Sequence, residues 1–293
     1  MLNNRKVGIV PELFYFCPGF MRKLIIIFLV LIASAGAKAQ LEVGLFAGTS
    51  YYMGDLNPNI PFRQSEFAYG FLARYNLSSR WAMKMNVYQG KIRGDDDVAN
   101  FIPDRGLSFS SGITELGGTM EFHFLPYYNG SLRSYWTPYL FAGAAMVYHR
   151  PKRNEADLRD FGTEGQYNTQ YLLPPDTERP EYSYYSFSIP FGMGVKYSFS
   201  KRIAASLEWG MRKTFTDYLD DVSTTYYTSV DLVTQGTDEY DDLVYSDPTL
   251  SHQPNMQRGN SKTNDWYSFA GLTITYYIDL RNRNKCSDFE QNY

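Results

Sequence analysis

The histidines are the residues of this chain whose chemistry is easiest to judge from spacing, because imidazole can bind a metal ion or act as a general base. The 293-residue sequence contains three of them, His123, His149 and His252. No two have the spacing of a shared metal site, such as His-x-x-x-His. His149 has no serine beside it to activate as a nucleophile. We therefore predict separate polar side chains, with no catalytic residue, no metal site and no cofactor.

Acidic side chains are concentrated in residues 217–264, where nine of them precede the first base, Arg258. They are Asp217, Asp220, Asp221, Asp231, Asp238, Glu239, Asp241, Asp242 and Asp247. Carboxylate oxygens bind divalent cations, so a calcium site is one interpretation. The Asp-x-Asp-x-Asp-Gly order of an EF-hand loop is missing, however, and a solvated anionic loop is the interpretation we prefer.

The strands that must position these side chains are predicted from an alternation of apolar and polar residues with period two. In residues 184–199, every second residue from Phe187 to Phe199 is apolar, and the residues between them are small or polar. Such a long strand with one apolar face suits a wall between lipid and water. Seven further segments alternate in the same way, at 41–53, 66–77, 81–91, 112–125, 135–149, 203–216 and 265–279. Eight segments predict an all-β fold, an eight-stranded antiparallel transmembrane β-barrel, since bacterial barrels have even strand numbers from eight upward.

The connections between these segments alternate in length. Three are short (78–80, 126–134 and 200–202) and four are long (54–65, 92–111, 150–183 and 217–264). Short periplasmic turns and long outer loops are typical of outer-membrane barrels, so both ends of the barrel chain should lie in the periplasm.

Two strands depart from the regular pattern. Pro190 removes one ladder hydrogen bond within its strand, and we expect a β-bulge there. The stretch from Tyr139 to Tyr148 is apolar on both faces, and its pattern assigns no inward face.

Tyrosine pairs recur near the expected strand ends. They are Tyr51-Tyr52, Tyr127-Tyr128, Tyr184-Tyr185, Tyr226-Tyr227 and Tyr276-Tyr277. Tyrosines at the boundary between membrane and water form girdles that hold a barrel at its depth. A girdle explains both the residues and their places, and a carbohydrate-binding rim is the alternative.

The strand faces place eight charged residues in the barrel interior. They are Glu42, Arg74, Lys84, Glu115, Glu121, Lys196, Glu208 and Arg212, four acids and four bases. Buried charges cost several kcal/mol each unless they are paired. An eight-stranded barrel has an interior just wide enough for side chains to fill. We therefore predict a polar network that fills a narrow lumen, which argues against an open diffusion pore.

The N-terminal residues predict an export signal. Arg22-Lys23 precede an apolar run from Leu24 to Ala33 and the site Ala37-Lys38-Ala39, so we expect cleavage after Ala39. Residues 1–20 are an upstream extension, 40–280 the barrel and 281–293 a periplasmic tail. Only Cys286 of the two cysteines lies in the expected mature chain, which excludes an intramolecular disulfide there. The formal charge of −3, without basic runs, gives no reason to expect nucleic acid as a partner.

Three segments go beyond a generic barrel pattern, from Leu45 to Pro58, from Trp136 to Gly143 and from Glu208 to Ser223. They resemble the DUF6089 family of outer-membrane barrels, which includes the PorG-type component of the type IX secretion system. The most specific residues are Gly54, Asp55, Asp217, Tyr218, Leu219, Asp220, Asp221 and Ser223. The resemblance implies an OmpA-like barrel without enzymatic activity that lies in outer-membrane lipid and contacts periplasmic proteins of the secretion machine. It supplies no catalytic residue.

The acidic motif directly follows the seventh expected strand, which ends near Arg212 and Lys213. The run from Asp217 to Asp221 could fold back and pair with these bases. Two other functions stay open on the residues alone. One is a general structural or surface ligand-binding barrel that works through its outer loops. The other is a small channel, which would need an open lumen.

Overall fold

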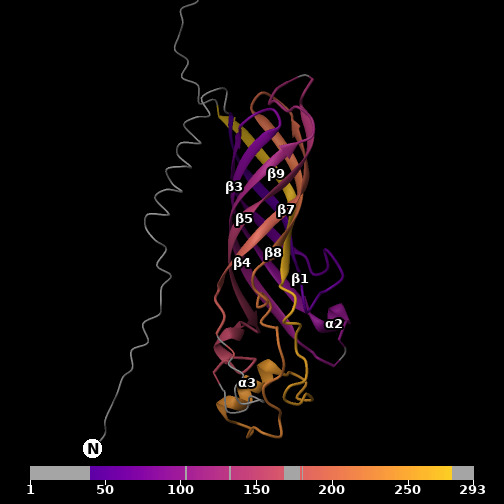
Figure 1. Ribbon diagram of the computed structural model, residues 1–293, viewed down its shortest axis with the longest axis vertical. Coiled ribbons are helices and arrows are strands. Elements are labelled where there is room, and N and C mark those ends of the chain that lie inside the picture. Colours follow the sequence, from indigo (N-terminus) through magenta and orange to yellow (C-terminus); the bar gives the residue numbers. More distant parts are fainter. Residues whose placement is uncertain (1–39, 103, 132, 168–178, 180, 279–293) are drawn as a thin grey trace, which may run out of the picture. The chain divides into compact units, whose positions relative to one another are not determined.

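The structure is a computed structural model that describes residues 40–102, 104–131, 133–167, 179 and 181–278 (Figure 1). The expected upstream extension, the signal sequence with its cleavage after Ala39, and the tail 281–293 with Cys286 lie outside the described residues. None of the helices in the described residues has the length and hydropathy of a membrane-spanning helix.

Eight long antiparallel strands form the barrel. They are β1 (Gln40–Met53), β2 (Glu66–Asn76), β3 (Trp81–Asp95), β4 (Ser108–His123), β5 (Trp136–Arg153), β7 (Tyr185–Ser198), β8 (Ile203–Thr214) and β9 (Trp266–Ile278). Each pairs with its neighbours in this order, and β1 pairs with β9, which closes the barrel. The predicted eight-stranded antiparallel barrel is confirmed. The short elements are β6 (Ala156–Asp157), α2 (Asp96–Ala99), η1 (Leu158–Phe161) and α3 (Asp238–Ser246).

Three strands are longer than the sequence predicts. β3 continues to Asp95, β4 begins at Ser108 and β5 continues to Arg153. The apolar alternation ends earlier because the outward residues of these extensions, such as Arg93 and Arg150, are polar or charged. The run of alternating apolar residues therefore marks the lipid-facing part of a strand, and the strand itself can be longer.

Side chains alternate between the outer wall and the lumen along every strand. In β7, Phe187 and Met193 are exposed on the wall, whereas Ser188 and Lys196 are buried inside. The structure also assigns the faces of the doubly apolar stretch in β5. Tyr139, Phe141, Ala145 and Val147 point inward, and Leu140 and Met146 point outward.

Pro190 lies in β7 without a bulge, so the expected β-bulge is wrong. The pairs Ala142 with Phe191 and Ala145 with Ser188 keep one register across the gap. The ladder between β5 and β7 is interrupted there, while Pro190 stays paired with Arg212 of β8. The barrel accommodates the missing donor on one side of the strand because the other ladder remains intact.

The two ends of the barrel differ. The three short turns and the first residue of β1 lie at one end, while α2, α3 and the long loops lie at the other (Figure 1). The long loops close their end with a hydrophobic plug, in which loop residues pack against the inward residues of the strands. Its loop members are Leu56, Leu107, Leu158, Leu219 and Val222. Its strand members include Ile92, Phe109, Ile113 and Val147. All are buried, so side chains fill the outer mouth.

Candidate functional site

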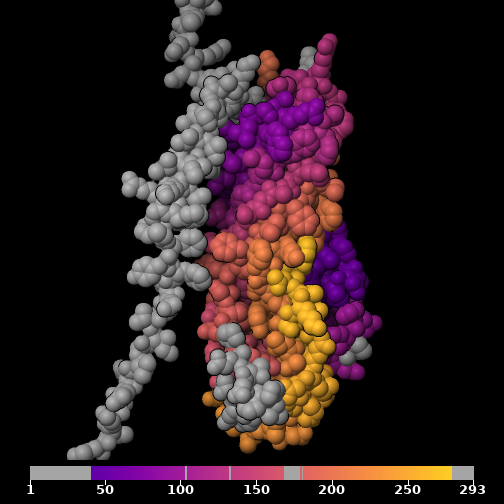
Figure 2. Space-filling view, viewed as in Figure 1, coloured from indigo at the N-terminus to yellow at the C-terminus, as the bar shows by residue number. Residues whose placement is uncertain are grey.

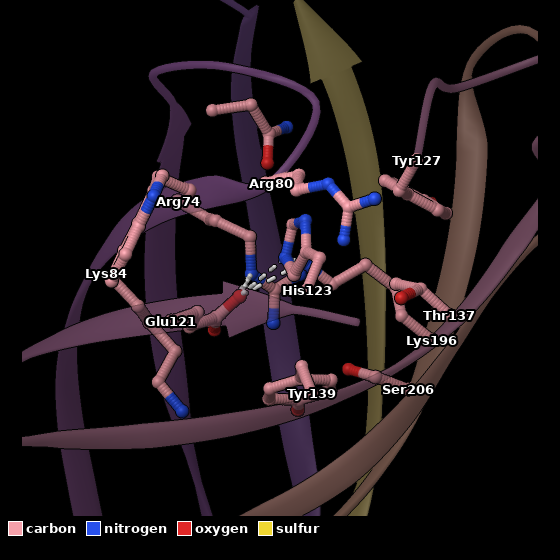
Figure 3. A network of polar contacts seen from close by, with 12 residues as sticks. Arg74, Arg80, Lys84, Glu121, His123, Tyr127, Thr137, Tyr139, Lys196 and Ser206 are labelled. Atoms are coloured by element: carbon pink, nitrogen blue, oxygen red, sulfur yellow. Dashed lines mark hydrogen bonds and ion pairs between the residues drawn. The ribbon is translucent and has the colours of Figure 1, made fainter. Parts of the chain in front are cut away.

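The eight charges expected in the lumen lie there, and every one of them is buried and forms an ion pair; we call this set the lumen network. Glu121 is at its centre (Figure 3). The Arg74 guanidinium lies 3.0 Å from both Glu42 and Glu121, and Lys196 Nζ lies 2.9 Å from Glu121. Lys196 also lies 3.0 Å from His123 Nε2.

Two further pairs cross the lumen nearer its middle. Lys84 Nζ lies 2.5 Å from Glu208, which also accepts a hydrogen bond of 2.9 Å from the Tyr139 hydroxyl. Arg212 lies 3.0 Å from Glu115. The partners come from strands that are not neighbours, β3 with β8 and β8 with β4, so the pairs connect opposite parts of the wall. Among the described residues, each of the eight lumen charges therefore has a partner of opposite sign, which offsets the cost of burying it.

The family-motif residues Gly54 and Asp220, far apart in the chain, meet at the outer mouth. The Tyr52 hydroxyl lies 2.5 Å from Asp220 Oδ2 and 2.9 Å from Asp265 Oδ1. Gly54 borders this contact so closely that a Cβ atom would lie 2.0 Å from Asp265 Oδ1 and 2.1 Å from the Tyr52 oxygen. Only glycine fits there without displacing the two side chains.

The two carboxyls hold one loop in place. Asp265 Oδ2 accepts a hydrogen bond of 2.9 Å from the Leu219 backbone N–H, and Asp220 Oδ1 accepts one of 2.9 Å from that of Val222. Leu219 and Val222 are members of the hydrophobic plug. The motif from Asp217 to Ser223 therefore fastens part of the plug into the mouth.

A tyrosine hydroxyl has one proton, so it can donate to only one of these two carboxyls. The other contact needs a proton on the carboxyl itself. Burial, together with the charge of Asp265, raises the pKa of Asp220 well above its usual range. Burial and the charge of Asp217 raise the pKa of Asp265 in the same direction. Asp220 and Asp265 are thus suited to share one proton, as two carboxyls in a single site do.

Other loop residues join the same region, which we call the outer-loop cluster. Its members are Tyr52, Asp55, Arg105, Glu164, Asp220, Asp221, Arg258 and Asp265, all from the outer mouth or the loops above it. Arg258 lies 3.1 Å from Glu164 and 3.6 Å from Asp221. Arg105 donates to the Asp55 backbone oxygen at 2.9 Å, and Asp55 Oδ2 accepts from the Asn260 N–H at 2.7 Å.

The other three motif residues lie at the edge of this cluster. The Ser223 N–H donates to Glu164 at 2.8 Å, and the Tyr218 ring stacks on Tyr182 with centroids 4.7 Å apart. Asp217 is partly buried, and burial raises its pKa to about 8. Asp221 is fully buried, which raises its pKa to about 6, with Arg258 acting in the opposite direction.

The expected pairing of the acidic motif with Arg212 and Lys213 is wrong. Arg212 points into the lumen to Glu115, and Lys213 lies on the opposite face of β8, with Nζ 5.8 Å from the centroid of the Trp266 ring. Successive residues of a strand face opposite sides, so one motif could not reach both. The motif turns over the mouth instead.

The solvated-loop interpretation of residues 217–264 is wrong for part of the run. Asp220, Asp221 and Asp247 are each 1% exposed, whereas Asp231 and Asp238 are exposed.

The predicted tyrosine girdle also needs correction, because several of the paired tyrosines are buried. These are Tyr51, Tyr52, Tyr127, Tyr226 and Tyr227, while Tyr128, Tyr185 and Tyr276 are exposed on the outside.

The three histidines lie apart. His123 is in the lumen network, the ring of His149 stacks near Tyr182, and His252 lies 2.9 Å from Asp247. Across the described ranges, no group of three or more histidine, cysteine, aspartate or glutamate side chains has the geometry to hold a metal ion.

Sequence reasoning missed five members of the outer-loop cluster: Tyr52, Arg105, Glu164, Arg258 and Asp265. One signal was present. Arg258 is the first base after nine acids, and a base in an acidic loop is a natural ion-pair partner. Glu164 carries no such signal, because its partner Arg258 lies on another loop. Arg105 pairs with Asp96 of its own loop, but it also donates to the backbone oxygens of Asp55 and Arg258 on two other loops, which no local pattern indicates.

A closed antiparallel barrel with an apolar outer wall and a polar, side-chain-filled lumen defines an outer-membrane β-barrel. The sequence matches the model of the family described as "Domain of unknown function (DUF6089)" over residues 22–234. The chain belongs to this family, as the resemblance indicated. A comparison with curated proteins finds no match.

The solved structures to which this chain is similar are distant in sequence. The N-terminal barrel domain of Pseudomonas aeruginosa OprF is 12% identical, with coverage of 82% of this chain and 100% of that one and a TM-score of 0.35. Neisserial surface protein A is 11% identical, with coverage of 82% and 99% and a TM-score of 0.41. The Yersinia pestis protein Ail is 8% identical, with coverage of 82% and 97% and a TM-score of 0.34.

Proposed function

We propose that this chain is a non-enzymatic outer-membrane barrel that serves as an accessory component of type IX protein secretion, through contacts with periplasmic proteins of that machine. The observation that carries the proposal is the closure of the interior. Paired charges fill the lumen and the hydrophobic plug fills the mouth. The surfaces left for function are therefore the wall and the two ends. The resemblance to the DUF6089 family supports the secretion role.

The short-turn end has the charge to bind a partner. Its turns, residues 77–80, 124–135 and 199–202, contain four bases and no acid. The bases are Arg80, Arg133, Lys201 and Arg202, all exposed. A surface with one sign of charge favours a partner with the opposite sign. We accordingly place the contact with the secretion machine at these turns, on an acidic surface of the partner.

The test is a deletion of the gene, followed by comparison of secreted and cell-surface proteins, with assembly of other outer-membrane proteins checked in parallel. The expected result is selective retention of exported cargo in the periplasm. An unchanged set of secreted proteins would contradict the proposal.

Complementation locates the contact. The double variant Arg133→Glu/Lys201→Glu should assemble but fail to restore export. The matched control Lys213→Glu/Lys262→Glu makes the same charge change at exposed positions of the outer end, and it should restore export fully. Equal behaviour of the two doubles would exclude the turns as the contact.

A second candidate is a surface ligand-binding barrel. A cavity of about 620 Å³ between the outer loops favours it, with apolar walls from Met53, Phe101, Ile102 and Trp266. Figure 2 shows the purple residues around α2 beside the yellow residues that lead to β9. This candidate predicts that Phe101→Ser/Ile102→Ser leaves export unchanged and removes binding to a panel of soluble glycans.

A further inference from the structure

The outer wall carries a groove across β3, β4 and β5, near their outer ends. Its volume is about 580 Å³. Lys91 forms one side, Arg150 and Lys152 form the other, and the floor is Ser110, Gly112 and Thr114 of the middle strand. We call these six residues the basic groove. All of them point away from the lumen, on the face that is in contact with the membrane lower down.

Strand register produces this shape. Lys91 pairs with Gly112, which pairs with Arg150, so the three residues lie in one row. A Cβ atom on Gly112 would have nothing within 4 Å, which leaves the space between the two cations open. Two strand spacings separate Lys91 and Arg150, about 10 Å between Cα atoms. A phosphate group fits between such cations and can accept hydrogen bonds from both.

Outward residues that are paired across β3, β4 and β5 form successive rows, which change from charged through polar to apolar along the strands. Next to the row of Lys91 is the row of Gln89, Thr114 and Tyr148, and beyond it the row of Val87, Leu116 and Met146. The last three side chains are exposed on the lipid-facing wall. A headgroup in the basic groove would thus have its acyl chains along this apolar row.

The same level of the barrel is aromatic elsewhere. Outward residues near the outer ends of the other strands include Phe67 and Tyr69 of β2 and Tyr185 and Phe187 of β7, all exposed. Aromatic side chains mark the boundary between lipid and water, and basic side chains at that boundary attract anionic headgroups. The basic groove therefore replaces the aromatic girdle in one sector of the wall.

Two of the three cations are available. Among the described residues, neither Lys91 nor Lys152 forms an ion pair through its ammonium group. Arg150 pairs with Asp157 but stays 45% exposed, and Glu155 is the one acid among the described residues that line the groove. The net charge of the site is positive.

We propose that the basic groove binds the phosphate-bearing headgroup of an outer-leaflet lipid. Charge complementarity selects the phosphate, and continuity with the lipid-facing wall selects a lipid over a soluble anion. One bound lipid would hold this sector of the barrel at a fixed depth, independently of any partner at the short-turn end.

The experiment titrates the full-length protein, purified in a neutral detergent, with lipid A and counts bound lipid by native mass spectrometry. Dephosphorylated lipid A tests the headgroup, and inorganic phosphate added as a competitor tests the source of the anion. The variant is Lys91→Gln/Lys152→Gln. The matched control, Lys213→Gln/Lys262→Gln, removes two exposed cations outside the groove. Circular dichroism establishes that both doubles are folded.

The groove variant should bind lipid A more weakly by about five-fold for each cation removed, while the control binds like the parent protein. Dephosphorylated lipid A should bind the parent and the groove variant equally weakly. Equal binding of the two lipids by the parent, or equal losses in the two doubles, would overturn the proposal. Displacement of lipid A by millimolar phosphate would overturn the choice of a lipid over a soluble anion.

Discussion

The lumen network and the outer-loop cluster both bury charged groups, but they neutralise them in different ways. In the lumen network, Glu121 lies within 3.0 Å of Arg74 and Lys196, and every other carboxylate has a basic partner as well. In the outer-loop cluster, Asp220 and Asp265 converge on the Tyr52 hydroxyl, and neither has an ion-pair partner among the described residues. Closure of the barrel brings opposite charges from different strands together in the lumen, whereas the loops hold Asp220 and Asp265 with backbone N–H groups and a shared proton.

The largest effect should follow from Glu121→Gln. This change leaves two buried bases, Arg74 and Lys196, without their common partner. Breaking a buried pair in this way costs about 3–5 kcal/mol. Urea unfolding of the protein in detergent micelles, followed by circular dichroism, measures the free energy of unfolding.

Glu66→Gln is the matched control, because Glu66 pairs with Arg93 on the outside, where Arg93 is half exposed. Its cost should be at most about 1 kcal/mol. Similar losses for Glu121→Gln and Glu66→Gln would show that the lumen network contributes no more than a surface ion pair.

Gly54→Ala should have the next largest effect, and it should act on the loops alone. The added Cβ collides with Asp265 and Tyr52, and such overpacking costs about 1–3 kcal/mol. We expect faster proteolysis of residues 217–264 with an intact barrel. Gly118→Ala is the control, since Gly118 faces outward with nothing within 4 Å of the added atom. Loops as resistant to protease as those of the parent would contradict the crowded contact.

The smallest effect concerns pH. A carboxyl whose pKa is higher in the folded than in the unfolded protein holds its proton more tightly when folded. For the loops over the mouth, the stability that such carboxyls contribute is therefore complete below the unfolded pKa of about 4. They should lose stability as pH rises toward 8, because the pKa values of Asp220 and Asp265 are raised and that of Asp217 is about 8.

Asp220→Asn tests this, because an amide resembles the protonated carboxyl. Hydrogen exchange of the Leu219 and Val222 amides should become faster from pH 5 to pH 8 in the parent protein, beyond the intrinsic change, and less so in the variant. The difference at pH 8 should be about 1 kcal/mol, on the scale of one pKa unit. Identical pH profiles would contradict proton sharing at Tyr52.

The barrel could be predicted from the sequence because each strand repeats one local rule. Alternation in β7 and β8 placed Lys196, Glu208 and Arg212 on one face, and eight such strands have one simple way to close. The ends of β3 and β5 could not be predicted this way, since their outward residues Arg93 and Arg150 are not apolar. Polar residues do not reveal whether a strand has ended or has only left the lipid.

The outer-loop cluster could be predicted only in part, for a different reason. Gly54 and Asp220 were identified through the family resemblance, but nothing local indicates that they share a contact with Asp265. Their proximity depends on the pairing of β1 with β9, which connects residues from opposite ends of the barrel sequence. Long-range contacts of this kind follow from the closed fold and not from any local pattern.

The pairing of β1 with β9 also determines when the barrel can close during assembly. Until residues 266–278 arrive, β1 and β8 are open edges with unpaired backbone groups, which cannot persist in lipid. Asp265 immediately precedes β9 and holds Leu219 in the mouth. The last strand to be translated thus seals the wall and fastens the plug in one event. A chain that stops short of β9 has neither, so the barrel cannot close in the membrane before β9 is in place.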